Sequence, residues 1–302
     1  MNRLVFCVTA IVCTFLCVLT IMPVMADAAG DVASLMNKVH KGEEVDISAV
    51  EAAPPEQVLA EVPKYLNNSD KSVRMEAVRR ISSIATYSPN RDTRKKGMRL
   101  LFDVATSHSD PRIAGYAAEG LLNFSRADFA PEMQGAIYRH LMSHKDAGEV
   151  NPKAILLAGI AGVKASAGRL REFASSSSKG MRWIAQLALA RMDDQAAIQV
   201  VVTAAKNETD STKRLESLHD LAFIRQPEAV GVMVTYLFSD EETPKSDSDA
   251  PSTKYAHTAI DYLAEIIENF PPKSGPYMDA YVDTARQWII EQGGTAKLKI
   301  KR

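Results

Sequence analysis

The stretch that decides the fold is Asp110–Phe124, which reads DPRIAGYAAEGLLNF. Asp110 is a residue type that caps helices, and Pro111 follows at the first helical position, where its missing N–H is not needed. Apolar side chains then recur at steps of four, four and three residues, at Ile113, Ala117, Leu121 and Phe124. This spacing places one apolar stripe along an α-helix. The small alanine and glycine residues beside the stripe predict closely packed helix neighbours.

The same arrangement recurs along the chain. Asp70–Ile81 has the cap, a Val-Arg pair, an alanine and an apolar residue four positions further on. Weaker copies begin at Asn151, near Met181, near Lys213 and near Tyr255. The aligned first positions are residues 73, 113, 154, 181, 213 and 255, which are 40, 41, 27, 32 and 42 residues apart. Such periods are typical of stacked two-helix units.

The pattern Asp-x-x-Val-Arg-x-x-Ala-x-x-x-Ile at Asp70–Ile81 resembles the second helix of HEAT repeats, including those of the lyase type. The segment Trp183–Val202 is similar to the helix, short acidic turn and helix of the same family. The resemblance covers residues 55–270. It implies an α-solenoid that binds proteins, and it transfers no catalytic residue. The chain departs from the pattern at Ala114, where the arginine is missing, and the copies at 154 and 255 lack the Val-Arg pair.

The first 28 residues predict a signal peptide rather than part of the fold. Arg3 precedes an uncharged, apolar run at residues 4–22, and small residues follow Pro23, so cleavage is expected after Ala26 or Ala28. A run of nineteen residues is also just long enough to span a bilayer, so retention as a membrane anchor is the alternative. Both outcomes predict export, to the periplasm or to the outside of a bacterial cell.

Composition argues against several classes of function. All three cysteines, at positions 7, 13 and 17, lie in the N-terminal segment, so the mature chain has no disulfide, thiol chemistry or thiolate metal site. Removing residues 1–26 takes away Arg3 alone among the charged residues, which leaves 35 basic and 37 acidic side chains. A balance this close to neutral argues against a dedicated nucleic-acid surface.

The rest of the chain is expected to be all-α. Glycine and proline fall mostly between apolar segments and no alternating strand pattern is sustained, which favours an α-α superhelix of the HEAT or armadillo kind with about six helix pairs. We expect an N-terminal helix and linker at residues 30–54, the repeat array at 55–270, and a terminal cap helix with a basic tail at 271–302. The acidic segment 239–253 is either a solvated insertion or a loop that contacts a partner.

The sequence contains no recognisable catalytic set. His140 and His144 are four residues apart on an expected helix, but the glutamate of a zinc-protease helix and a third ligand are missing, so surface histidines are the preferred interpretation. Gly159, Gly162 and Gly168 lack the residues that accompany phosphate-binding loops, and no Gly-x-Ser-x-Gly turn occurs. We therefore predict no catalytic residue, no metal and no cofactor.

The candidate binding surface is the inner face of the superhelix, which the second helices line in such arrays. If positions 73, 77 and 81 face the core, positions 76, 79, 80 and 83 point elsewhere on the same helix. Applied to four copies, this rule gives the candidate partner-binding residues Arg79, Arg80, Tyr116, Glu119, His219, Asp220, Asp261, Tyr262 and Glu265. Their charge changes from basic to acidic along the array, which favours a partner of complementary polarity. The apolar third copy, residues 154–163, is either buried or the centre of a binding patch.

The function expected from these features is that of a non-enzymatic scaffold or docking protein of the cell envelope, which binds a protein partner along the groove. Two alternatives stay open. The first is an enzyme accessory, or a lyase-type HEAT protein, that binds a small molecule. The second is a membrane-anchored subunit of a complex, which contacts the membrane only if residues 4–22 are retained.

Overall fold

The computed structural model describes residues 27–144, 149–244, 253–273 and 278–301. The predicted signal or anchor segment up to residue 26 and the middle of the acidic loop lie outside these ranges. The described part is all-α, with fifteen α-helices, short 3-10 turns and two isolated β-bridges. Helices pack against their neighbours in sequence order, as in an α-solenoid, so the predicted fold class is confirmed. None of the described helices combines the length and the apolar character needed to span a bilayer.

The chain divides into two compact units, residues 1–101 and 102–302, and the boundary falls inside helix α6 (Arg91–Ser107). The helices of unit 1 before α6 are α2 (Ala28–Lys41), α3 (Ser48–Ala52), α4 (Pro55–Glu61) and α5 (Lys71–Tyr87), with a 3-10 turn η1 (Val62–Tyr65). Those of unit 2 after α6 are α7 (Pro111–Leu121), α8 (Pro131–Ser143), α9 (Pro152–Ala161), α10 (Ala167–Ala174), α11 (Lys179–Arg191), α12 (Gln195–Asn207), α13 (Ser211–Ile224), α14 (Pro227–Leu237), α15 (Tyr255–Ile266) and α16 (Met278–Glu291).

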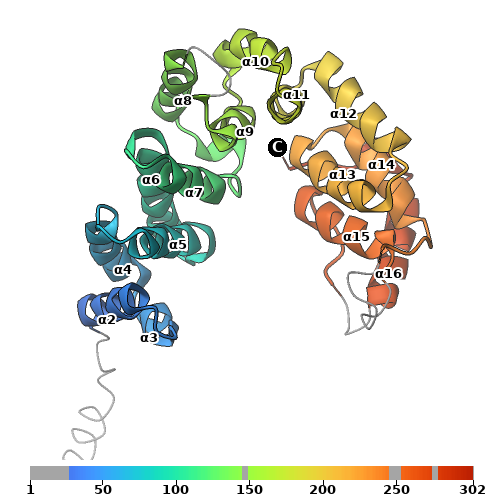
Figure 1. Cartoon of the computed structure of the whole chain (residues 1–302). Helices are drawn as coiled ribbons and strands as arrows, with labels where there is room; N and C mark the ends of the chain where they lie inside the picture. Colours follow the sequence, from blue (N-terminus) through green and yellow to red (C-terminus); the bar gives the residue numbers. More distant parts are fainter. Residues whose placement is uncertain (1–26, 145–148, 245–252, 274–277, 302) are drawn as a thin grey trace, which may run out of the picture. The chain divides into compact units, whose positions relative to one another are not determined.

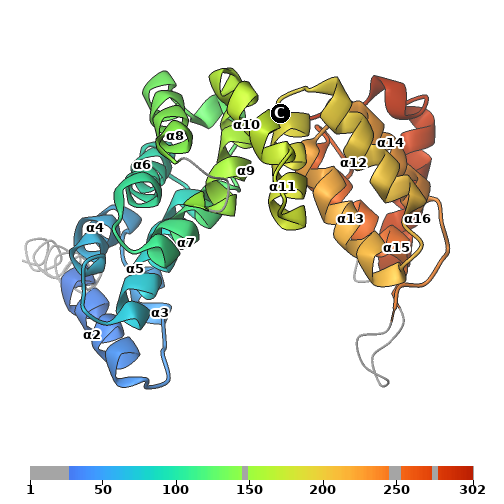
Figure 2. The same cartoon turned by 45° about the horizontal axis from the view of Figure 1, so that its top comes forward.

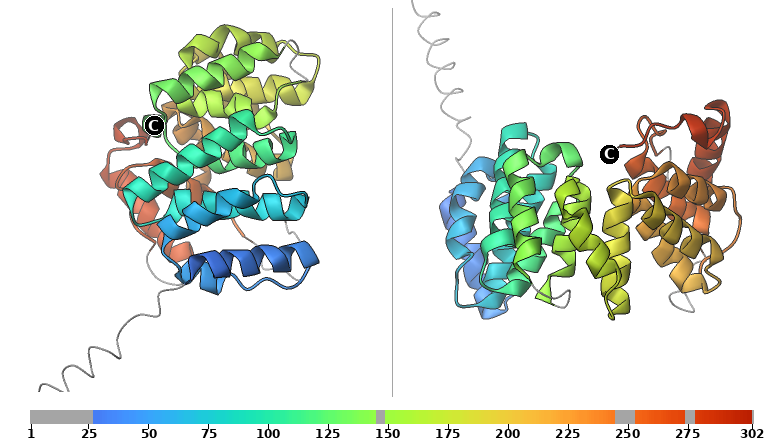
Figure 3. Two further views of the ribbon diagram at one scale, coloured as in Figure 1. Left: turned by 90° about the vertical axis from the view of Figure 1, so that its left-hand side faces the viewer. Right: turned by 90° about the horizontal axis from the view of Figure 1, so that it is seen from above.

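In unit 1, α2 packs against α3, α4 and α5, and the blue and teal helices follow one another in sequence order (Figures 1 and 3). Val32, Leu35 and Met36 of α2 are buried in this packing. The helix expected from Pro55 stops at Glu61, and Pro63 lies in the 3-10 turn that follows, because proline cannot supply the backbone N–H of an α-helix interior. Helix α3 lies in the segment that the sequence predicts to be a helix and linker, residues 30–54.

In unit 2 the helices form two layers. Helix α9 packs against α7 and α11, and α13 packs against α11 and α15, so the second helices of successive pairs form a continuous row. Helices α12 and α14 pack together in the other layer (Figures 1 and 2). The row is close-packed at Gly159, where an added Cβ would lie 2.8 Å from the Cα of Ala188. The glycine predicted to allow close helix packing does so here.

The second helices begin at the predicted caps. The carboxylate of Asp70 accepts a hydrogen bond of 2.8 Å from the backbone N–H of Ser72. Asp110 accepts one of 2.9 Å from the N–H of Arg112, with Pro111 at the first helical position. Capping of this kind satisfies a backbone donor that has no partner within the helix.

The arginine four residues after a cap has a recurrent role. Nη1 of Arg74 donates to the backbone carbonyls of Asn68 and Ser69, at 2.8 and 3.0 Å. Arg182 makes the same contacts with the carbonyls of residues 176 and 177, at 2.7 and 2.8 Å, and Arg94 with that of residue 88, at 2.6 Å. We call this contact of Arg74, Arg94 and Arg182 the arginine clamp. It ties the turn before a helix to that helix.

Candidate partner-binding groove

The second helices of unit 2 line a groove of ≈ 720 Å³. Helices α7, α9, α11, α13 and α15 all contribute side chains to it. The apolar lining residues are buried or half-buried and form the floor: Leu122, Leu156, Ile160, Trp183, Ile184, Leu187, Ala222, Phe223 and Tyr262. The charged or titratable lining residues are Glu119, Lys153, Arg191, Glu216, His219, Asp220, Arg225 and Glu265. An apolar floor below charged side chains is a typical composition for a binding site.

The structure brings five of the nine predicted residues together in this groove: Glu119, His219, Asp220, Tyr262 and Glu265. Tyr116 and Asp261 are exposed but do not line it. Arg79 and Arg80 belong to unit 1, on helix α5. The offset rule therefore predicts five residues of the groove in unit 2. The two basic residues that it predicts, Arg79 and Arg80, do not line this groove.

The placement of Arg80 away from the core is wrong. Its exposed fraction is only 8%, and its Nε lies 2.8 Å from the carboxylate of Glu76, which is also buried. Arg80 lies among tertiary neighbours of α5: Val50 and Glu51 of α3 line the same pocket, and α5 also packs against α2 and α4. Arg79 is exposed as predicted, and its Nη1 donates to Glu76 over 3.0 Å.

Asp220 is held in a defined position within the groove. The indole Nε1 of Trp183 donates to Oδ2 of Asp220 over 2.8 Å, which links α11 to α13. Nδ1 of His219 lies 3.8 Å from the other carboxylate oxygen, and the His219 ring stands edge-on to Tyr262 of α15, with ring centroids 6.1 Å apart. Asp220 thus links α11 to α13, and the neighbouring His219 ring contacts α15.

The charges around His219 favour its protonated form. The carboxylate of Asp220, 3.8 Å away, raises the pKa of His219 above the ordinary value of 6.5, and the negative charge of Glu265 acts in the same direction. Burial and Lys153 act against this rise. The pKa of the Tyr262 hydroxyl is raised, first by burial and then by Glu265 and Asp220. The groove therefore contains an imidazole whose protonated form is favoured by its neighbouring carboxylates.

Most of the other charges in the groove are paired. Nζ of Lys153 lies 3.7 Å from the carboxylate of Glu119, and Nη2 of Arg225 lies 3.3 Å from that of Glu265. Among the residues that the structure describes, Glu216 has neither an ion pair nor a side-chain hydrogen bond. With His219 neutral, the α13 side of the groove is acidic.

Arg225 also joins the groove to the C-terminal tail. It adopts a left-handed backbone conformation, with φ 50°, directly after α13. Its Nη1 donates to the carbonyl of Lys301 over 3.2 Å, and the N–H of Lys301 donates to the carbonyl of Ile266 over 2.8 Å. Burial lowers the pKa of the Arg225 guanidinium, and Glu265 counteracts this effect. The tail that the sequence predicts as basic is therefore folded against the end of α15.

The two neighbouring histidines do not assemble a metal site in the described residues. The rings of His140 and His144 are 4.8 Å apart and edge-on, and Nδ1 of His144 hydrogen-bonds to the carbonyl of His140. Burial lowers the pKa of His140, and the neighbouring His144 lowers it further. In residues 27–144, 149–244, 253–273 and 278–301, no group of three or more His, Cys, Asp or Glu side chains could hold a metal ion.

Some groove residues were missed although the sequence held a signal for them. Positions three, six, seven and ten after the aligned residue 213 are Glu216, His219, Asp220 and Phe223, and all four line the groove. Three of the same four offsets after residue 181 give Ile184, Leu187 and Arg191, which also line it, whereas the fourth gives Ala188, which does not. The lining residues that lie off these offsets are Leu122, Lys153, Leu156, Trp183, Ala222 and Arg225. Extending the offsets to every copy and to apolar residues therefore predicts more of the groove, but not all of it.

The groove combines carboxylates, one imidazole and apolar side chains, a composition that suits the binding of a ligand or partner. Residues 154–163 contribute to both expected roles, because most of α9 is buried while Leu156 and Ile160 reach the groove. No model of a known protein family matches the chain, and none of the curated proteins is similar to it.

Proposed function

We propose that this chain is a non-enzymatic binding protein of the cell envelope that holds a segment of a partner protein in the groove of unit 2. The observation that carries this proposal is the groove itself, lined by five successive second helices over ≈ 720 Å³. Residues 4–22 support export, by cleavage of a signal peptide or as a retained anchor. Sequencing of the mature N-terminus by mass spectrometry distinguishes these two outcomes.

The partner segment that fits is apolar and carries at least one lysine or arginine. Trp183, Phe223 and Tyr262 offer large apolar surfaces, and aromatic residues of this kind often dominate the energy of an interface. Glu216 and the partly exposed Asp220 provide negative charge beside them. A lysine or arginine between apolar anchors would meet this charge while the anchors cover the floor.

A crosslinking experiment tests the location of the partner. A photoreactive amino acid is placed at Phe223, in the groove, or at Val200, an exposed residue of α12 in the other layer. We expect the partner to be captured from Phe223 and not from Val200. Equal capture from both positions would reject the groove as the binding surface.

A charge reversal tests the chemistry of recognition with the captured partner. Glu216→Lys is expected to weaken binding by about tenfold or more, because a basic group of the partner then meets a like charge. Glu228→Lys is the matched control, since Glu228 is exposed at the start of α14 and does not line the groove. Equal affinities of the two variants, measured by calorimetry on the full chain, would contradict the proposed partner chemistry.

A further inference from the structure

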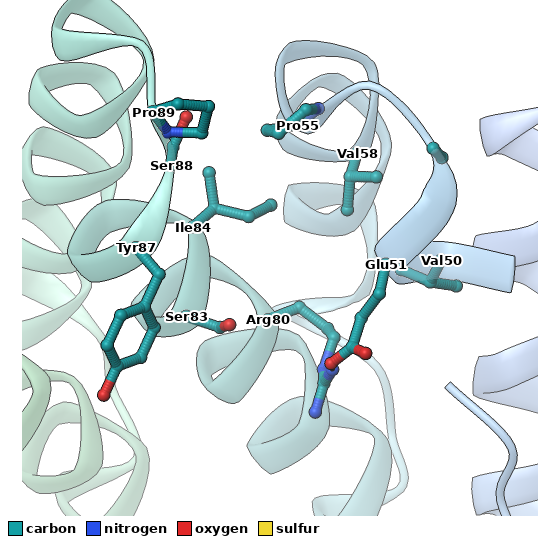
Figure 4. A pocket seen from close by; sticks show the side chains of 11 residues that line it. Val50, Glu51, Pro55, Val58, Arg80, Ser83, Ile84, Tyr87, Ser88 and Pro89 are labelled. Atoms are coloured by element: carbon teal, nitrogen blue, oxygen red, sulfur yellow. The ribbon is translucent and has the colours of Figure 1, made fainter. Parts of the chain in front are cut away.

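Unit 1 contains a second concave site, a pocket of ≈ 370 Å³. Figure 4 shows Ile84 and Pro89 on one side, from α5 and the turn after it, and Pro55 and Val58 of α4 on the other. Arg80 and Glu51 meet at one end of the pocket (Figure 4). A volume of this size lies within the range of small-molecule sites. All of its lining residues belong to unit 1, so it is independent of the function proposed for unit 2.

The single cation that lines the pocket is buried. The side chain of Arg80 is 9% exposed, and one edge of its guanidinium is occupied because Nε lies 2.8 Å from Glu76. Glu76 also accepts a hydrogen bond from Arg79, so its negative charge is shared between two arginines. Glu76 alone therefore does not neutralise the positive charge of Arg80 at this end of the pocket.

The remaining partner of Arg80 is weakly held. Nη1 of Arg80 is 3.8 Å from the carboxylate of Glu51, which is too long for a hydrogen bond, and the Glu51 side chain is 58% exposed. An exposed ion pair of this length contributes little free energy. Glu51 is thus a weakly bound counter-ion of Arg80, and a carboxylate from solution can replace it.

We infer that this pocket binds a small monocarboxylate with a short apolar body. Its carboxylate would displace that of Glu51 and accept hydrogen bonds from the terminal nitrogens of Arg80, a geometry that guanidinium groups favour. Its apolar body would lie between Ile84 and Pro89 on one side and Pro55 and Val58 on the other. Among the described residues, Arg80 is the only cationic side chain that lines the pocket, so a ligand with a single anionic group fits it best.

Hexanoate and hexanamide form a matched pair of probes, and their binding is measured by calorimetry. The sample is the full chain, with its N-terminal segment cleaved or retained as the producing cell leaves it. Hexanoate is expected to bind in the millimolar range or tighter, and hexanamide about tenfold or more weakly, because it lacks the charge. Glu51→Gln is expected to tighten hexanoate binding by about twofold to fivefold, since it removes the competing carboxylate. The matched control is Glu56→Gln, an exposed residue of α4 outside the pocket, which should leave the affinity unchanged.

A double variant provides a second test that preserves the balance of buried charge. Glu76→Gln with Arg80→Gln removes both charges together, and it is expected to abolish hexanoate binding while a cooperative thermal transition remains. Hexanoate binding at wild-type strength by this double variant would overturn the inference. So would equal binding of acid and amide by the wild type, or a Glu51→Gln variant that binds hexanoate no more tightly.

Discussion

The groove of unit 2 and the pocket of unit 1 hold their charges in opposite ways. Around the groove, the side chains of Glu119 and Glu265 are 58% and 63% exposed and their ion pairs are long. In the pocket, Arg80 and Glu76 are 9% and 7% exposed and in close contact. Exposed pairs contribute little to stability and can exchange for a partner's charges, whereas a buried charge without its partner destabilises the fold. The first arrangement can exchange its ions with those of a partner, and in the second Glu76 holds Arg80 in place at the end of the pocket.

The largest effect is expected at the buried pair. Arg80→Met should lower the free energy of unfolding by ~3–5 kcal/mol, because it leaves the carboxylate of Glu76 buried without its close partner. Urea denaturation measures this value. Adding Glu76→Gln to Arg80→Met should recover most of the loss, since no uncompensated charge is then buried. If the single and double variants are equally unstable, the cost arises from lost packing, and the contrast between the two sites fails.

A smaller loss is expected behind the floor of the groove. Gly159→Ala should destabilise the chain by ~1–3 kcal/mol, because the new Cβ would lie 2.8 Å from the Cα and 2.9 Å from the carbonyl oxygen of Ala188. Gly231→Ala is the matched control in helix α14, where an added Cβ meets no atom within 4 Å. That control should be stabilising by up to ~1 kcal/mol, through helix propensity. Thermal melts of both variants test whether α9 and α11 are as close as described.

The hydrogen bond between Trp183 and Asp220 is expected to contribute less to stability than the two features above. Trp183→Phe keeps most of the apolar floor but removes the N–H donor, so it should destabilise the chain by about 1 kcal/mol. A double-mutant cycle with Asp220→Ala, which removes the acceptor, isolates the hydrogen bond from the change in packing. A coupling energy of zero would show that the groove is not ordered through Asp220.

The smallest effect is the pH dependence of His219. Its pKa is raised in the folded chain, so its contribution to stability is fully present below pH 6.5, the ordinary value, and is lost as the pH rises through the folded value. The contribution is small because the His219 side chain is 69% exposed. NMR titration of the imidazole should give a pKa above 6.5, and Asp220→Asn should lower it. A wild-type pKa at or below 6.5 would contradict the geometry described here.

Protonation of His219 should also weaken binding of a basic partner segment. The groove then gains a positive charge beside Glu216 and Asp220, which opposes the partner's lysine or arginine. Affinity measured on both sides of the His219 pKa should therefore fall toward low pH. A His219→Gln variant serves as the control, because its affinity should not change with pH over the same range.

The helices were predictable because their signals are local. Caps such as Asp70 and Asp110, and the stop at Gly42, depend on a few consecutive residues, and each lies where the sequence places it. The sequence does not predict helix α3, because five residues are too few to show a periodic apolar stripe. It is stabilised by tertiary contacts, with Val50 buried, rather than by its own sequence.

The sequence predicts where the groove residues lie on their helices, but it does not predict how far each side chain is buried. The offsets that give His219 and Asp220 depend on helix geometry alone, which the repeat fixes. Whether such a residue is exposed depends on what covers that flank of the helix. Arg80 sits at the same type of position as Asp220, yet its tertiary neighbours bury it, and a sequence pattern confined to α5 holds no information about those contacts.

The arginine clamp has a consequence for how far the sequence can vary. Arg74, Arg94 and Arg182 grip the turns before their helices through main-chain carbonyls, which every amino acid possesses. The clamp itself therefore tolerates substitutions within those turns, provided that the backbone path is kept. The side chains of Asn68, Ser88 and Ser176 also accept a backbone hydrogen bond in their own turns, so these positions are constrained for a second reason. In the turn before Pro111, where Ala114 replaces the arginine, that freedom should be narrower, and substitutions there should be tolerated less often.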